Sequence, residues 1–328
     1  MQRAVRLILF VLGIGVAAYL VNQHAGIVRE SLTRVGWGFG IYLAASFVVY
    51  ALDTWGWRLA FAREHPEISF GRLFSIRMAG EAVNKVTPLA SMGGEPLKAY
   101  LLNRCGVPSG EALASVGVAK NVMTLAQIAF IFVGVGISRT IVPGKSAALL
   151  GMAIFPGIIL TAMIVTAFLD HRLRRSKKAG ATEAARPANP HSLMALWGQF
   201  ADFFWAHPGS VLLSFLAFFL GWAAGALELL AAAYLLGFQL SIRDALAYEA
   251  LLASVNMATF FIPANAGSQE GGFTYLAPLL GLPPYGVALA VLRRCRDVVW
   301  VLFGLAYLAI TEGRVLVRPA AAAPETAA

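Results

Sequence analysis

Long apolar stretches, each about as long as a membrane-spanning helix, recur along the whole chain. A helix needs about 20 apolar residues to cross about 30 Å of hydrocarbon. The pattern predicts spanning helices at 5–22, 36–56, 118–138, 146–169, 209–236 and 286–310. Two more apolar stretches, 73–103 and 246–280, contain Pro and Gly residues that interrupt straight helices, so we expect re-entrant or broken helices there. The predicted fold is an all-α, polytopic integral membrane protein.

The composition supports a membrane protein and argues against a nucleic-acid partner. Apolar residues make up 59% of the chain and charged residues 13%, against about 45–50% and about 25% in soluble domains. The net charge of +9 comes mostly from basic residues between the apolar segments. Such residues set topology and attract anionic lipid head groups, so nucleic acid is not an expected partner.

The basic residues also predict an orientation. Five of them, between Arg172 and Lys178, follow the fourth predicted span and place that loop in the cytoplasm. Counting outward puts both termini in the cytoplasm of a bacterial inner membrane, with Arg77 and Lys98 among the cytoplasmic cations. The expected organisation is one transmembrane domain, 1–312, with repeat halves at about 36–169 and 191–312, a basic linker at 170–190 and a disordered tail at 313–328.

The two interrupted segments resemble each other. Four pairs of residues match at one offset of 175 (270 − 95): Glu95 and Glu270, Pro88 and Pro263, Gly106 and Gly281, Pro108 and Pro283. Lys120-Asn121 corresponds to Arg296-Asp297 at an offset of 176. An odd number of predicted spans separates the segments, so the repeat is expected to be inverted. Paired interrupted helices of this kind lie at the binding site of many transporters.

Several ionisable or polar residues lie within or beside apolar runs, where a charge costs roughly 2.5–3.5 kcal/mol. They are Glu95, Lys120, Asn121, Glu228, Glu270, Arg293, Arg294, Arg296 and Asp297. Helical spacing allows Glu95 to pair with Lys98, and Arg293 to share a face with Arg296 or Asp297. Carboxylates beside Arg and Lys suit a phosphate-bearing or zwitterionic head group, while the alternative is pairing that only fixes helix register.

Other polar residues rank lower. Asp53 lies beside Tyr50 and Trp55, which is typical of an interfacial anchor. Glu81, Asn84 and Lys85 belong either to the first interrupted segment or to a solvated mouth.

Catalytic signatures are sparse. The five histidines fall in predicted loops and the linker, without an HExxH, nucleophile-elbow or Walker A motif. Cys105 and Cys295 have no CxxC spacing. No metal, cofactor or enzymatic activity is therefore expected.

Two motifs carry a resemblance to a known family. SMGGEPLKAYLLNRCGVPSGEALASV and PANAGSQEGGFTYLAPLLGLPPYGVALAVLRR resemble the transmembrane, flippase-like region of lysylphosphatidylglycerol synthases and their stand-alone relatives. The run VNKVTPLASMGGEPLKAYLL looks like the branch associated with hopanoid biosynthesis. Ala264 and Ser268 stand where that family commonly has glycine. The resemblance transfers a site made of Gly93, Gly94, Glu95, Pro96 and Lys98, and of Gly267, Glu270 and Gly271.

The resemblance implies lipid translocation. In the synthases this region is credited with moving the modified lipid between leaflets, while a separate soluble domain performs the aminoacyl transfer. The leading hypothesis is an inverted-repeat lipid transporter with Glu95 and Glu270 at its centre and Lys98, Arg293 and Arg296 as head-group cations. Its expected partners are membrane lipids, anionic head groups at the basic loop and lipid-synthesis enzymes. The alternatives are an intramembrane transferase and a membrane scaffold for such enzymes.

Overall fold

The computed structural model describes residues 22, 25–63, 65–86, 93–179, 203–283 and 285–317. Within these residues the chain is helical and contains no strand, which confirms the all-α prediction. The helices are α2 Ala25–Val35, α3 Phe39–Arg58, α4 Phe70–Val86, α5 Gly94–Asn103, α6 Ser109–Ile141, α7 Ser146–Ala179, α9 Pro208–Leu236, α10 Ile242–Ala258, α11 Ser268–Leu279 and α12 Gly286–Val317. Three short 3-10 helices, Gly36–Gly38, Pro143–Lys145 and Pro263–Asn265, lie between them.

Within the described part of the chain, four helical stretches are long and apolar enough to cross a membrane: Arg29–Arg58, Ser109–Ile141, Pro143–Thr166 and Pro208–Leu236. They match four of the six predicted spans. The prediction for 286–310 corresponds to α12, which is 32 residues long but carries four charged residues in its first half. The predicted span at 5–22 lies outside the described residues, apart from residue 22.

Two helices, α7 and α12, continue past the boundaries predicted for the linker and the tail. The first part of the predicted linker, 170–179, is helical and ends α7. The predicted tail begins at 313, but α12 continues to Val317. Lys and Arg are good helix formers, and cations in a last helical turn interact favourably with the helix dipole, so the basic run prolongs α7.

The structure repeats at the offset seen in the sequence. Shifting α4 by 175 residues gives 245–261, close to α10, and shifting α5 by 175 gives 269–278, close to α11. Shifting α6 by 176 gives 285–317, one residue from the start of α12. The two interrupted segments are therefore helical hairpins, α4–α5 and α10–α11, each followed by a long helix.

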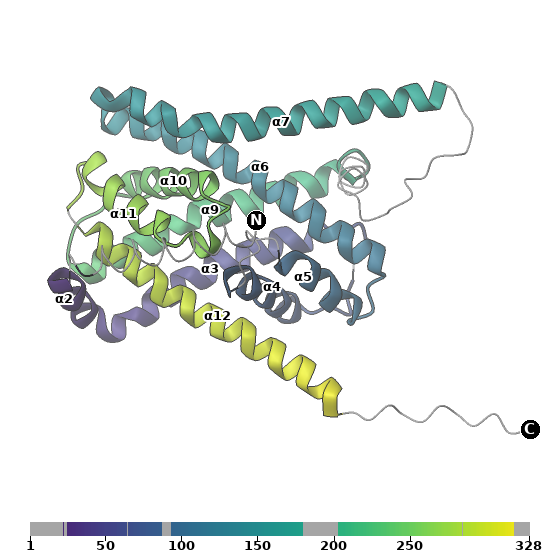
Figure 1. The fold of residues 1–328 in the computed structure, drawn as a ribbon, viewed down its shortest axis with the longest axis horizontal. Helices are drawn as coiled ribbons and strands as arrows, with labels where there is room; N and C mark the ends of the chain where they lie inside the picture. The colour runs from purple at the N-terminus through teal and green to yellow at the C-terminus, as the bar shows by residue number, and fades with distance from the viewer. Residues whose placement is uncertain are drawn as a thin grey trace, which may run out of the picture.

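The two halves are inverted and interlocked. Figure 1 shows α6 and α12 crossing the bundle in opposite directions, as α3 and α9 also do. The α4–α5 hairpin lies toward the end where α12 finishes, here called the α5 end, and the α10–α11 hairpin lies toward the opposite, α11 end. α4 packs against α12, α10 against α6, and α3 against α9. Each hairpin is thus held by the long helix of the other half.

A glycine lies at the matched turn that connects each hairpin to the long helix after it. Gly106 lies between α5 and α6 with a φ of 98°, and Gly281 lies between α11 and α12 with a φ of 71°. Only glycine adopts such left-handed conformations without steric cost. The matched positions 106 and 281 therefore mark equivalent turns.

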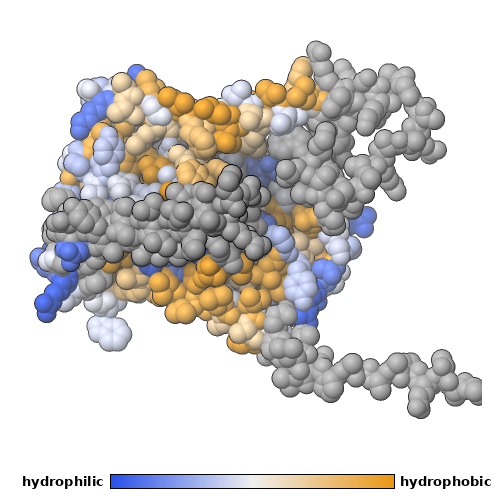
Figure 2. All heavy atoms as spheres, in the orientation of Figure 1, coloured by the Kyte–Doolittle hydropathy of each residue, from blue (hydrophilic) through white to orange (hydrophobic). Residues whose placement is uncertain are grey.

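The bundle has a largely apolar outer surface, and its apolar core encloses a set of buried charged side chains. Figure 2 shows hydrophobic residues along the upper and lower parts of the visible face and hydrophilic residues mainly toward its left and right ends. Ile154, Ile158 and Ile164 of α7 are each more than half exposed. An exposed apolar surface of this extent is unusual in soluble monomers and suits contact with lipid.

Candidate functional site

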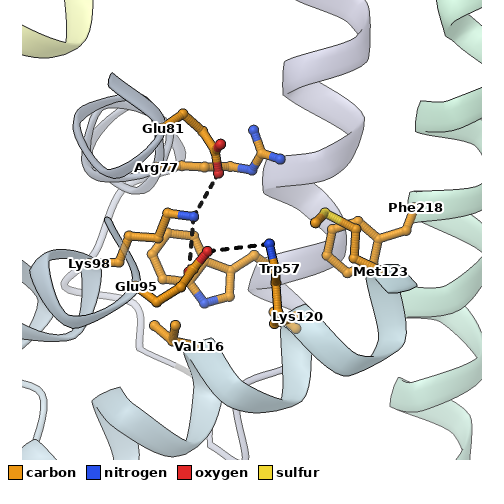
Figure 3. Close-up of a pocket in the computed structure, with 10 residues that line it drawn as sticks. Trp57, Arg77, Glu81, Glu95, Lys98, Val116, Lys120, Met123 and Phe218 are labelled. Carbon is orange, nitrogen blue, oxygen red and sulfur yellow. Dashed lines mark hydrogen bonds and ion pairs between the residues drawn. The ribbon is translucent and has the colours of Figure 1, made fainter. Parts of the chain in front are cut away.

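The first polar cluster lies where the α4–α5 hairpin meets α6 (Figure 3). Lys98 of α5 donates hydrogen bonds to Glu81 of α4 (2.7 Å) and to Glu95 (3.1 Å). Lys120 of α6 places its ammonium 3.5 Å from the other carboxylate oxygen of Glu95. Arg77 of α4, beside this group, donates to Asp53 of α3 at 2.7 Å. Four helices of the first half, α3, α4, α5 and α6, therefore contribute cations or carboxylates to one interior region.

Close backbone packing brings the arms of the first hairpin together. The amide of Gly94 donates to the side-chain carbonyl of Asn84 at 2.7 Å, which satisfies an N–H group at the start of α5. A Cβ atom on Gly94 would lie 2.0 Å from the carbonyl oxygen of Gly80. A side chain at position 94 would therefore push α5 away from α4.

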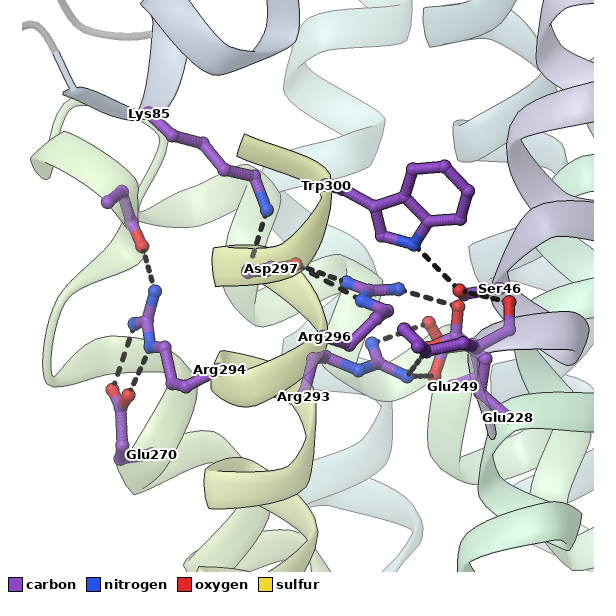
Figure 4. Close-up of polar contacts among 12 residues, drawn as sticks. Ser46, Lys85, Glu228, Glu249, Glu270, Arg293, Arg294, Arg296, Asp297 and Trp300 are labelled. Atoms are coloured by element: carbon purple, nitrogen blue, oxygen red, sulfur yellow. Dashed lines mark hydrogen bonds and ion pairs between the residues drawn. The ribbon is translucent and has the colours of Figure 1, made fainter. Parts of the chain in front are cut away.

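The second cluster is centred on α12 (Figure 4). Arg293 donates two hydrogen bonds, of 2.9 and 2.7 Å, to the carboxylate of Glu249 on α10. Arg296 donates to Glu228 of α9 at 2.5 Å and to Asp297 at 2.6 Å. All five side chains are buried. Bidentate and charge-assisted bonds of this kind compensate the loss of water around buried charges.

Arg294 holds the turn of the second hairpin. Its Nε donates to Glu270 at 2.5 Å, and its guanidinium also donates to the carbonyls of Ala264 (2.7 Å) and Asn265 (2.9 Å). Glu270 in turn accepts from the amide of Gly267 at 2.8 Å, which caps α11. Ala264 and Asn265 adopt left-handed φ values of 53° and 49°, a conformation that costs roughly 1–2 kcal/mol in a residue other than glycine. The arginine therefore stabilises a strained turn.

The two clusters form one continuous polar interior. Lys85 of α4 lies 2.6 Å from Asp297 of α12. The Tyr50 ring contacts both Arg77, at 5.9 Å, and Arg296, at 5.6 Å, in cation–π geometry. A hairpin of the first half and the long helix of the second half are thus joined through charged side chains.

A separate polar contact lies at the α5 end, outside the predicted spans. His65, in the loop between α3 and α4, lies 2.6 Å from Glu67 and 3.1 Å from Glu111. Burial lowers the pKa of His65, but hydrogen bonds to the two carboxylates outweigh that effect and raise the pKa above 6.5. A cavity of about 360 Å³ lies beside this loop and is lined by residues such as Trp55, Arg58 and His207.

Comparison with known proteins identifies the family. Residues 1–305 match the lysylphosphatidylglycerol synthase TM region. The chain belongs to this family. It is also 28% identical over 130 residues to a UPF0104 membrane protein of Methanothermobacter thermautotrophicus, a match that covers 39% of this chain and 38% of that protein. No solved structure matches the chain.

Some of the residues that the family motifs transfer to this chain make ion pairs, others lie at the starts of helices, and one, Gly271, has no packing role. Glu95, Lys98 and Glu270 make the ion pairs described above, and Gly94 and Gly267 have backbone roles at the starts of α5 and α11. Gly93 is the N-cap of α5, and Pro96 lies in the first turn of that helix. A Cβ atom on Gly271 would meet nothing within 4 Å, so no packing requirement explains a glycine there.

The other predicted site residues also divide. Lys120, Arg293, Arg296 and Asp297 enter the polar interior. The expected pair of Glu95 with Lys98 forms, and Arg296 pairs with its neighbour Asp297, a pair that was not predicted from the sequence. Asn121 instead donates to the carbonyl of Gly117 in its own helix at 2.9 Å. This hydrogen bond stays within α6 and does not join the ion pairs of the interior.

Three expectations about polar residues need correction. Arg77 was counted with the cytoplasmic loop cations, yet it is 6% exposed and lies inside the bundle. Asp53 was expected to be an interfacial anchor, but its carboxylate is paired with buried Arg77. Lys85, ranked low in the sequence, joins the two halves. Their sequence neighbours resemble those of membrane-surface residues, and only tertiary packing reveals the partners.

Glu249 is the interior residue that the sequence reasoning missed. It lies in the segment YEALLASVN of α10, within the second interrupted stretch. An acidic residue surrounded by Ala and Leu in an apolar segment is a signal that could have found it. Among the described residues, no group of three His, Cys, Asp or Glu side chains is placed to hold a metal ion.

Proposed function

We propose that this member of the lysylphosphatidylglycerol synthase TM region family moves a membrane lipid between the leaflets of a bacterial inner membrane. The observation that carries the proposal is the combination of two inverted helical hairpins with a charged interior and an apolar exterior. Transporters built from inverted repeats place their substrate sites at such interrupted helices. The lipid-related name of the family is consistent with this function.

The physical problem in lipid translocation is the polar head group. A charge near the bilayer centre costs at least about 2.5–3.5 kcal/mol, and irregular backbone is tolerated there only within protein or beside water. Here the hairpins bring carboxylates and cations from both halves into the interior, while apolar side chains cover the outside. A head group passing along Glu95, Arg77 and Arg296 would exchange its hydration for these groups while its acyl chains remain in lipid.

The same proposal includes an orientation. The α5 end carries the end of α7, where the sequence has its densest basic run, Arg172–Lys178. Positively charged segments favour the cytoplasmic side. We therefore assign the α5 end to the cytoplasm and the α11 end to the outside.

The test is leaflet-resolved movement of labelled lipids in proteoliposomes, with phospholipid, hopanoid and polyprenyl lipids assayed separately. The wild type is expected to move at least one class, and the Glu95→Gln, Glu270→Gln double variant is expected to lose that movement. Glu30→Gln is the matched control, because the Glu30 side chain is 74% exposed and outside the interior. It is expected to behave as the wild type.

The same samples discriminate the alternatives. Mass spectrometry of the recovered lipids detects a covalent product, which would favour an intramembrane transferase. If the wild type moves none of the lipids, with or without an ion gradient, lipid translocation is wrong. If the double variant moves lipid as fast as the wild type, the two glutamates are not part of the route.

A further inference from the structure

A small cavity in the first cluster contains hydrogen-bonding groups without partners. It is lined by both arms of the α4–α5 hairpin and by α3, α6 and α9, and its volume is about 20 Å³. One nitrogen of Arg77, Nη2, donates to Asp53, but Nη1 is buried and has no hydrogen-bond acceptor. The Arg77 side chain is 7% exposed. A buried guanidinium with an unused donor is costly unless something else accepts from it.

Lys120 faces the same cavity from α6. Its ammonium lies 3.5 Å from Oε1 of Glu95, and that oxygen has no hydrogen-bond partner. The Lys120 side chain is 44% exposed, so it can move without unfolding the bundle. Lys98, in contrast, is engaged by two carboxylates at 2.7 and 3.1 Å. Arg77 and Lys120 therefore each have at least one unused donor at this cavity, whereas Lys98 is already held between two carboxylates.

Figure 3 shows how these groups are arranged. Arg77 and Lys120 point into the space between α4 and α6 from opposite sides, and Met123 and Phe218 close that space on a third side. Apolar walls exclude water and strengthen electrostatic interactions between a ligand and the two cations. The arrangement is a pair of cations facing one another across a partly apolar cavity.

We propose that Arg77 and Lys120 bind the phosphate of the ligand's head group. Guanidinium and ammonium groups both bind phosphate oxygens through charge-assisted hydrogen bonds. The unpartnered oxygen of Glu95 would accept from a hydroxyl or ammonium next to that phosphate. This inference rests on the proposed function and names its substrate class: a lipid with a phosphate and a neighbouring hydrogen-bond donor.

The site has two consequences for conformation. A volume of about 20 Å³ holds about one water molecule, so a phosphate enters only when the Lys120 side chain moves outward. Among the described residues, the turn of the second hairpin offers no equivalent pair of unused donors, because Arg294 already donates to Glu270 and to the carbonyls of Ala264 and Asn265. In this conformation the two hairpins therefore differ in the donors that they leave unused.

The binding test uses purified full-length protein in detergent, with thermal unfolding as the readout. The probes are dioctanoyl phosphatidylglycerol, dioctanoylglycerol, which lacks the phosphate, and sodium phosphate. The phospholipid is expected to stabilise the wild type, and Lys120→Gln is expected to need roughly tenfold to a hundredfold more of it, as for loss of one charge-assisted bond. Arg77→Lys, which keeps a charge toward Asp53, is expected to show a similar weakening.

The control is Lys145→Gln, which removes a cation at the α11 end, where Lys145 donates to the carbonyl of Leu279 at 3.4 Å. It is expected to respond to the phospholipid as the wild type does. Equal stabilisation of the wild type and Lys120→Gln, or equal stabilisation by dioctanoylglycerol, overturns the inference. A Lys120-dependent shift with sodium phosphate as large as that with phosphatidylglycerol supports an anion site whose ligand is free phosphate, and overturns the lipid assignment.

Assaying Lys120→Gln in proteoliposomes separates this inference from the proposed function. Lipid movement without Lys120-dependent binding leaves the function standing and rejects the phosphate site. Lys120-dependent binding without any lipid movement keeps the site and rejects the function.

Discussion

The pairing of Arg293 with Glu249 gives the sharpest test of the charged interior. Both side chains are less than a tenth exposed, and they share two hydrogen bonds of 2.9 and 2.7 Å. Removing one member of a buried ion pair costs about 3–5 kcal/mol, because the other charge loses its compensation. Glu249→Gln is expected near the lower limit, since Arg293 keeps the Glu228 carboxylate at 3.5 Å. Arg293→Met is expected near the upper limit, because it leaves the Glu249 carboxylate without this cation.

The assay is reversible chemical denaturation in mixed micelles, followed by circular dichroism, from which free energies of unfolding are obtained. The double variant Arg293→Met, Glu249→Leu is expected within about 1–2 kcal/mol of the wild type, because both charges are removed together. Glu30→Gln serves as the surface control: its partner Arg34 lies 3.9 Å away and both side chains are at least half exposed, so a change of at most about 1 kcal/mol is expected. A cost below about 1 kcal/mol for Glu249→Gln would show that water reaches the pair, contrary to the reasoning.

Three further predictions concern the hairpins and the loop at the α5 end. Ala264→Gly is expected to stabilise the protein by about 1 kcal/mol in the same denaturation assay, because glycine relieves the left-handed φ of 53°; unchanged stability would contradict the strain. Gly94→Ala is expected to destabilise it by at least about 2 kcal/mol, since the new Cβ would lie 2.0 Å from the Gly80 carbonyl, whereas Gly136→Ala, with nothing within 4 Å, serves as control. The raised pKa of His65 means that its ion pairs stabilise the fold fully below pH 6.5 and lose effect as pH rises through the raised pKa. His65→Gln is therefore expected to lower the melting temperature more at pH 6 than at pH 8.5, and an equal loss at both pH values would refute the pairing.

The helical organisation was predictable because two kinds of sequence run determine it: long apolar runs, and apolar runs interrupted by Gly and Pro. Apolar runs long enough to cross a bilayer became α3, α6, α7 and α9, and the Gly- and Pro-containing runs became hairpins. The matched Gly106 and Gly281 were informative because both turns require a left-handed residue. Sequence patterns that depend on local backbone geometry or on the hydrophobicity of a segment therefore predict structure without knowledge of the tertiary contacts.

The composition of the interior was less accessible. Asp53 resembles an interfacial residue in the sequence because aromatic residues flank it. Arg77 resembles one because it lies in the helix that follows a short loop. Their burial depends on how α3 and α4 pack, which neither segment encodes alone. The carboxylate of Glu249 on α10 neutralises the buried charge of Arg293 on α12, and the two residues are 44 positions apart in the chain. Ion-pair partners at such separations follow from the packing of the whole bundle.

The register of the two long helices shows where a repeat stops being informative. At an offset of 176, Lys120 aligns with Arg296, yet the cation that contacts Glu270, the counterpart of Glu95, is Arg294. Two residues amount to about 200° around a helix, so the aligned arginine points away from the hairpin and binds Glu228 and Asp297 instead. The first hairpin consequently faces a lysine at 3.5 Å, and the second an arginine bonded to its carboxylate and to two backbone carbonyls. Equivalent glutamates therefore lie in unequal surroundings, one in a cavity with unused donors and the other in a saturated turn, and this inequality follows from contacts that the repeat in the sequence does not contain.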